Sequence, residues 1–100
     1  MKIGLLVTRD SFKDDIIGLT NAALKKGNEV IIFLMDDGTR HSQDSDIVAL
    51  KDKEGVTMSL CDHSAKLRGI TEDMIPKGVA AGSQYQNSIM NQDADRVVLI

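Results

Sequence analysis

Short apolar runs recur along this chain, and they constrain its fold more than any other feature. Residues 2–8 (KIGLLVT) and 29–35 (EVIIFLM) are nearly continuous in apolar side chains, and 56–61 (VTMSLC) and 96–100 (RVVLI) are shorter runs. Runs of this length, without polar alternation, are typical of strands that are buried on both faces. Such strands need cover from helices on each side, so the runs predict a parallel sheet in an α/β domain.

Segments with helical character separate these runs. After Asp10 and Ser11, which can cap a helix, apolar residues from Phe12 to Leu24 recur at helical spacing, and Gly27 ends the segment. The other expected elements are a loop at 39–46, short helices or turns at 47–53, 64–68 and 71–74, a short strand at 79–81 and a helix at 83–91. This order predicts one domain over residues 1–100, a three-layer α/β/α sandwich whose parallel sheet has four to five strands.

Composition narrows the classes of partner. The net charge is −3, and Lys25-Lys26 is the only adjacent basic pair, so no nucleic-acid partner is expected. No stretch approaches the ~20 apolar residues that span a membrane, and the first residues do not read as a signal peptide. A single cysteine cannot form an intramolecular disulfide, which fits a reducing compartment. We therefore expect a cytoplasmic protein without a membrane partner.

Polar residues follow three of the predicted strands. Ligands of open parallel sheets bind beyond the carboxyl ends of the strands, where these residues should gather. The rule selects four candidate ligand-binding residues, Arg9 after the first strand and Asp36, Arg40 and His41 after the second. The loop after the first strand, TRDSFKDD, has no glycine that would let the backbone approach a phosphate. The sequence therefore disfavours a nucleotide site, and we expect no cofactor.

Cys61, at the end of the third strand, is the candidate for chemistry. The thiolate is the reactive form of cysteine, and a position between a strand end and a helix start favours that anion. His63 could share a face with Cys61 and act as a base if strand geometry continued past the cysteine. Alternatively, Cys61 is a buried hydrophobe and His63 faces solvent. A metal site built from Cys61, His63, His41 and Asp36 would match no recognised zinc spacing.

Several segments together resemble a known family. The opening KIGLLVT, the strand EVIIFLMDDG and the segments SLCDHSAKLRGI and IPKGVAAGSQYQ are similar to the DsrE/DsrF-like proteins, which share the YchN-like fold. The resemblance covers essentially the whole chain. It implies a parallel-sheet α/β/α domain that assembles into dimers, trimers or hexamers. It also implies a role in a sulfur relay, with Cys61 in the position of the cysteine that holds sulfur as a persulfide.

Three hypotheses of function follow. In the leading one, the protein is a sulfur carrier that takes sulfur on Cys61 from a donor protein and passes it to an acceptor protein, without being a conventional turnover enzyme. Thiol–disulfide-type exchange of this kind needs only one thiolate here, because the partner supplies the other. The second hypothesis is a non-catalytic oligomeric domain that binds a small ligand or a partner, with a structural cysteine. The third is a thiol peroxidase or another cysteine enzyme. The carrier hypothesis expects an open position for the thiol.

Overall fold

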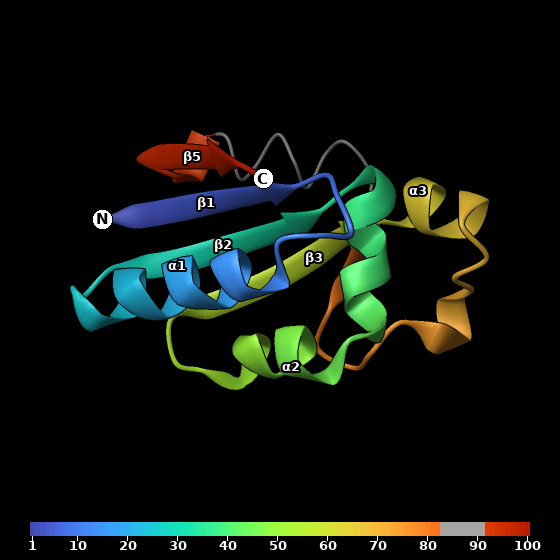
Figure 1. Cartoon of the computed structure of the whole chain (residues 1–100), viewed down its shortest axis with the longest axis horizontal. Coiled ribbons are helices and arrows are strands. Elements are labelled where there is room, and N and C mark those ends of the chain that lie inside the picture. Colours follow the sequence, from blue (N-terminus) through green and yellow to red (C-terminus); the bar gives the residue numbers. More distant parts are fainter. Residues whose placement is uncertain (83–91) are drawn as a thin grey trace.

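Five parallel strands form one sheet in the order β4-β3-β2-β1-β5 (Figure 1). The computed structural model describes residues 1–82 and 92–100, so the helix expected at 83–91 lies outside the described residues. The strands are β1 (Lys2–Val7), β2 (Glu29–Leu34), β3 (Val56–Cys61), β4 (Ala80–Gly82) and β5 (Arg96–Leu99).

The strands expected from the apolar runs all form. The third coincides with its prediction, and the first, second and last each end one residue before the expected limit. The short strand expected at 79–81 lies one residue later, at 80–82. In the centre of the sheet, β1 and β2 are paired from Lys2 opposite Glu29 to Val7 opposite Leu34. The predicted sheet of four to five parallel strands is confirmed, with five.

Helices connect the strands. They are α1 (Lys13–Lys25), α2 (Ser45–Val48), α3 (Asp62–Leu67) and the 3-10 segments η1 (Asp36–Gln43), η2 (Ala49–Asp52) and η3 (Glu72–Met74). In Figure 1, α1 and α2 lie on one face of the sheet, and α3 lies beyond the end of β3. Among the described helices, none has the length and apolar character that a membrane span requires.

The start of α1 differs from the sequence prediction. Asp10 and Ser11 do not cap the helix; Phe12 is the N-cap residue, with a left-handed backbone (φ 63°) and no capping side-chain hydrogen bond. Phe12 is 47% exposed instead of facing inward, and Leu19 is 43% exposed. The inward face of α1 is formed by Ile16 and Thr20, which are fully buried. The expected apolar stripe was therefore too wide.

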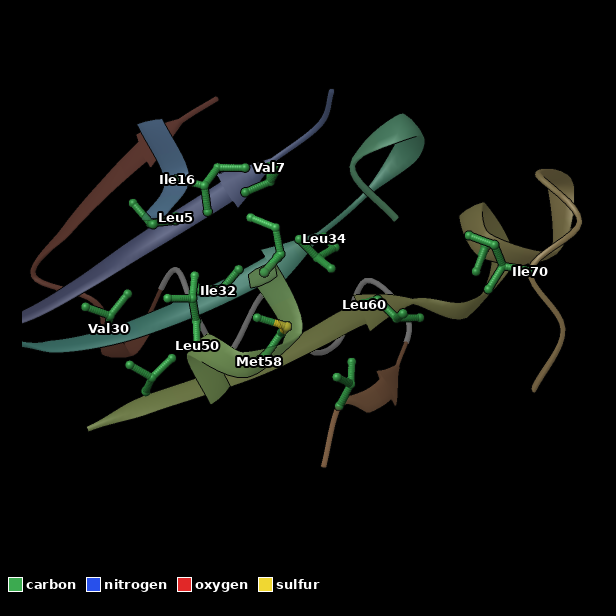
Figure 2. Packing of buried hydrophobic residues seen from close by; sticks show 14 residues of the cluster. Leu5, Val7, Ile16, Val30, Ile32, Leu34, Leu50, Met58, Leu60 and Ile70 are labelled. Atoms are coloured by element: carbon green, nitrogen blue, oxygen red, sulfur yellow. The ribbon is translucent and has the colours of Figure 1, made fainter. Parts of the chain in front are cut away.

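Helices α1 and α2 cover one face of the sheet, and the larger part of the core lies between these helices and the sheet (Figure 2). Alternate strand residues point into it, because successive side chains of a strand face opposite sides. Its fully buried members include Leu5, Val7, Ile32, Leu34 and Leu60 from the strands, with Ile16 and Ile47 from the helices. A smaller cluster centres on Phe33 and Cys61, which project to the other face of the sheet. Packing on both faces agrees with the predicted α/β sandwich.

The loop predicted at 39–46 is largely helical. η1 covers Asp36–Gln43, and its polar residues Thr39 and Ser42 are buried. Burial is possible because the hydroxyls are satisfied locally: Thr39 Oγ1 donates to the Asp36 carbonyl at 2.7 Å, and Ser42 Oγ donates to the Thr39 carbonyl at 2.7 Å. Local hydrogen bonding of this kind gives no apolar periodicity, so the sequence pattern could not indicate it.

Candidate functional site

The carboxyl ends of β1, β2 and β3 lie at one edge of the sheet, as the parallel topology requires. At this edge Cys61 is the last residue of β3, and α3 begins at the next residue. The predicted position of the cysteine, between a strand end and a helix start, is therefore confirmed. Arg9 follows β1, and Asp36, Arg40 and His41 lie on η1 after β2.

The Cys61 side chain is buried, which contradicts the expectation of an open thiol. Only 5% of the residue is exposed. Cys61 points to the face of the sheet opposite α1, where it clusters with the fully buried Phe33. Partly buried apolar residues complete this cluster, namely Leu6, Ile31, Met35 and Ala94. The sulfur is therefore surrounded by apolar side chains, and a partner can reach it only after part of this cluster moves.

His63 does not stand in the predicted relation to Cys61. Helix α3 starts at Asp62, so the strand geometry that would place the two side chains on one face ends at the cysteine. His63 is exposed in the first turn of α3. Within residues 1–82 and 92–100, no hydrogen bond joins it to the thiol. The geometric reason for a Cys61–His63 pair is thus wrong, and a role as base stays a prediction.

His41 joins two segments of the sheet edge. The ring is buried, and its Nε2 lies 2.9 Å from the backbone carbonyl of Arg9. A ring nitrogen can bond that carbonyl only as a donor, so this contact places a proton on Nε2. It connects η1 to the loop after β1. Of the predicted ligand-binding residues, His41 and Arg9 are thus brought together, through the Arg9 backbone and not its side chain.

The Arg9 side chain is exposed and faces a groove that Cys61 does not line. This groove has a volume of about 460 Å³ and is lined by Thr8, Arg9, Phe12, Asp15, Leu19, Leu99 and Ile100. It lies between the start of α1 and the end of β5, which are distant in sequence. The sequence could not indicate the groove, because its lining comes from two segments that only the fold brings together.

The remaining predicted residues, Asp36 and Arg40, lie exposed on η1. Asp36 has a left-handed backbone (φ 51°), and Arg40 Nε lies 3.8 Å from Asp10 Oδ2. Both side chains of this ion pair are more than half exposed, so the pair adds little stability. Among the described residues, no contact holds the side chain of Asp36 or Arg40 in a way that would prevent it from meeting a partner.

Sequence reasoning missed one ionic contact at this edge. Arg68, at the end of α3, donates from Nε to Asp37 Oδ1 at 2.7 Å and from Nη1 to the Ser64 carbonyl at 3.0 Å. The hydrogen bond from Arg68 holds the pKa of the Asp37 carboxyl below its ordinary value of 3.8. The contact ties η1 to the helix that follows Cys61. No local pattern reveals it, because the two residues are 31 positions apart.

The described part of the chain contains no group of three or more His, Cys, Asp or Glu side chains that could hold a metal ion.

Comparison with known proteins identifies the relatives of this fold. The family model described as "DsrE/DsrF-like family" matches residues 1–99. The crystal structure of the ychN protein from E. coli superposes with a TM-score of 0.78 at 15% identity, covering 100% of both chains. MTH1491 from Methanobacterium thermoautotrophicum, a protein of unknown function, gives 0.74 at 14% identity, covering 99% of this chain and 98% of its own. At such identities these two structures show a common fold. No curated protein matches the sequence.

Proposed function

The chain belongs to the DsrE/DsrF-like family, and from that premise we propose that it carries sulfur as a persulfide on Cys61 in a cytoplasmic relay. The observation that carries this proposal is the place of Cys61. It is the only cysteine in the sequence, and it ends β3 at the edge of the sheet where parallel α/β domains bind their ligands. The resemblance drawn from SLCDHSAKLRGI assigns the sulfur-bearing role to this same position.

The proposed transfer consists of two balanced exchanges. The Cys61 thiolate attacks the outer sulfur of a donor protein's persulfide, a new S–S bond forms, and the donor leaves as a thiolate. Cys61 then bears the persulfide. An acceptor thiolate attacks its outer sulfur, and Cys61 leaves as a thiolate in turn. No net oxidation occurs, so neither a cofactor nor a second cysteine in this chain is needed.

Burial gives the carrier a specific requirement. Because Cys61 is 5% exposed and packs with Phe33, the donor must displace part of the apolar cluster before sulfur can move. The same burial would protect a bound persulfide, since oxidation of cysteine sulfur depends on access. Transfer should therefore occur on docking of a partner and slowly with free thiols. The exposed Asp36 and Arg40 are the proposed contacts for that partner, and homo-oligomeric assembly is part of the proposal.

Burial of the thiol also favours a second candidate. A free cysteine packed among apolar side chains often serves as a small hydrophobic residue. In this alternative the domain binds a small ligand or a partner at the sheet edge, and Cys61 fills space beside Phe33.

Intact-mass spectrometry of the folded protein separates these candidates. The protein is incubated with glutathione persulfide as the sulfur donor, and the near-isosteric variant Cys61→Ser is the control. The carrier predicts a gain of one sulfur atom that is absent from Cys61→Ser. Because the apolar cluster must open before the thiol reacts, the carrier predicts slow uptake from this small donor. A folded protein that still gains no sulfur after prolonged incubation, and whose thiol is alkylated by iodoacetamide only in urea, would refute the carrier and support the structural cysteine. Rapid peroxide consumption would instead indicate the cysteine enzyme.

The variant His63→Gln tests the proposed base. If His63 deprotonates the thiol, sulfur uptake should become slower in this variant, and the deficit should shrink as the pH rises and the thiolate forms without help. Unchanged uptake at every pH would leave His63 without a role in the transfer.

A further inference from the structure

The groove beside Arg9 lies where the strand order of the sheet reverses. From β1 the chain adds β2, β3 and β4 in turn on one side, and β5 then pairs with the other side of β1 (Figure 1). The groove is lined from β1 by the following residues Thr8 and Arg9, and from the end of β5 by Leu99 and Ile100. Ligands of open parallel sheets bind outside the carboxyl ends of the strands at such a reversal. This groove, two strands away from Cys61, therefore has the position of a ligand site.

One face of α1 forms the wall of the groove. Phe12, Asp15 and Leu19 recur at intervals of three and four residues, which places them on the same side of the helix. Ile16 and Thr20, on the neighbouring face of α1, are fully buried against the sheet. Their packing holds the wall in a fixed place opposite the end of β5, although Phe12 and Leu19 are nearly half exposed.

Hydrogen bonds fix the loop between β1 and α1. Thr8 donates to the Ile100 carbonyl from its backbone nitrogen at 2.8 Å and from Oγ1 at 3.1 Å. The buried His41 donates to the Arg9 carbonyl at 2.9 Å. The loop ends at Phe12, whose left-handed backbone (φ 63°) is unfavourable for a bulky residue. Backbone of this kind persists where the surrounding structure fixes it, and it clusters at ligand sites. The groove is thus preformed.

The lining combines an apolar surface with one charge of each sign. Its apolar members are Phe12, Leu19, Leu99 and Ile100. The volume of about 460 Å³ falls within the range of roughly 300–1,000 Å³ that is typical of small-molecule sites. Arg9 and Asp15 supply the charges, and within residues 1–82 and 92–100 neither side chain takes part in an ion pair. A guanidinium group binds a carboxylate through charge-assisted hydrogen bonds, and a carboxylate accepts such bonds from an ammonium group.

From these observations we propose that the groove binds an apolar α-amino acid in its zwitterionic form. The carboxylate of the ligand pairs with Arg9, and its ammonium group pairs with Asp15. The side chain of the ligand packs among the apolar residues of the lining. The proposal does not rest on sulfur transfer, since Cys61 does not line the groove.

Other ligand classes fit this groove less well. An aliphatic carboxylate would pair with Arg9 but would leave Asp15 without a partner, beside a second negative charge. An uncharged apolar molecule would cover both charges and satisfy neither. A long peptide carries its two terminal charges too far apart to place both in one groove. Only a small zwitterion with an apolar side chain uses all parts of the lining.

Isothermal titration calorimetry of the folded protein with L-leucine tests this proposal. Two derivatives keep the side chain and lack one charge each, because N-acetyl-L-leucine has no ammonium group and L-leucinamide has no carboxylate. We expect saturable binding of L-leucine at millimolar concentration or below. Both derivatives should bind more weakly by roughly tenfold or more, since each loses a charge-assisted contact. A protein that shows no saturable binding of L-leucine would overturn the proposal, and so would decanoate or either derivative binding as tightly as L-leucine.

Charge variants locate the site. Arg9→Gln and Asp15→Asn should each weaken L-leucine binding by roughly tenfold or more. Arg9→Gln should also bind L-leucine and L-leucinamide almost equally, because the partner of the carboxylate is gone. Asp14→Asn is the matched control, since Asp14 is the neighbouring acid in the first turn of α1 and does not line the groove. Unchanged affinity in both Arg9→Gln and Asp15→Asn would refute this site. Sulfur uptake on Cys61 is a separate measurement, so either result can fail without the other.

Discussion

The close approach of Gly38 to β1 allows a stability effect to be worked out from the structure. A Cβ atom placed on Gly38 would lie 2.0 Å from the Val7 carbonyl oxygen and 2.6 Å from the carbonyl carbon. The backbone of Gly38 is not in the left-handed region, so the constraint is space and not conformation. This separation is shorter than an ordinary van der Waals contact by more than about 1 Å. Gly38→Ala must therefore push η1 away from the end of β1 by roughly that distance.

The energetic cost has two parts. The Val7 carbonyl accepts a hydrogen bond from Met35 at 2.8 Å, and moving η1 weakens this bond, which is worth about 1 kcal/mol. Forcing a methyl group into a packed site costs a further ~1–3 kcal/mol. Gly38→Ala should thus destabilise the protein by about 2–4 kcal/mol.

Urea unfolding followed by far-UV circular dichroism measures this difference, at one fixed protein concentration so that self-association does not alter the comparison. Gly18→Ala is the matched control, since a Cβ on Gly18 meets nothing within 4 Å and the residue lies inside α1. This control should be more stable than the parent by up to ~1 kcal/mol. If Gly38→Ala were as stable as the parent protein, the argued clash would be refuted.

Two further predictions concern polar groups. In the described chain, Thr20 Oγ1 is buried and has no hydrogen-bond partner. The isosteric variant Thr20→Val should therefore be more stable than the parent protein by about 1 kcal/mol in urea unfolding. A loss of stability in this variant would show that the hydroxyl is satisfied. The hydrogen bond from Arg68 lowers the pKa of Asp37 from 3.8, so this carboxylate stabilises the fold above that pH, and its contribution disappears as the pH falls through the folded-state pKa. Asp37→Asn should therefore be less stable than the parent at neutral pH and equal to it in strong acid; a difference that is the same at both pH values would contradict this assignment.

The predictions that held were those that depend on segments of the chain taken one at a time. The strand 56–61 forms as expected because its own residues favour extended backbone and its ends are marked by Gly55 and the start of α3. The place of Cys61 at a strand end followed from the same pattern. The errors concern exposure: the apolar stripe predicted for α1 included Phe12, which is 47% exposed, and the carrier hypothesis expected an open Cys61, which is 5% exposed.

The sequence by itself determined the order of strands and helices, the parallel α/β class and the edge of the sheet at which Cys61 lies, because apolar runs and their spacing act locally along the chain. Only the tertiary structure decided that the cysteine is covered beside Phe33, that Gly38 of the polar segment η1 packs against Val7, and that β5 is an edge strand with exposed apolar side chains. The physical reason is that burial depends on which distant segments meet, and no pattern within one segment records what covers it.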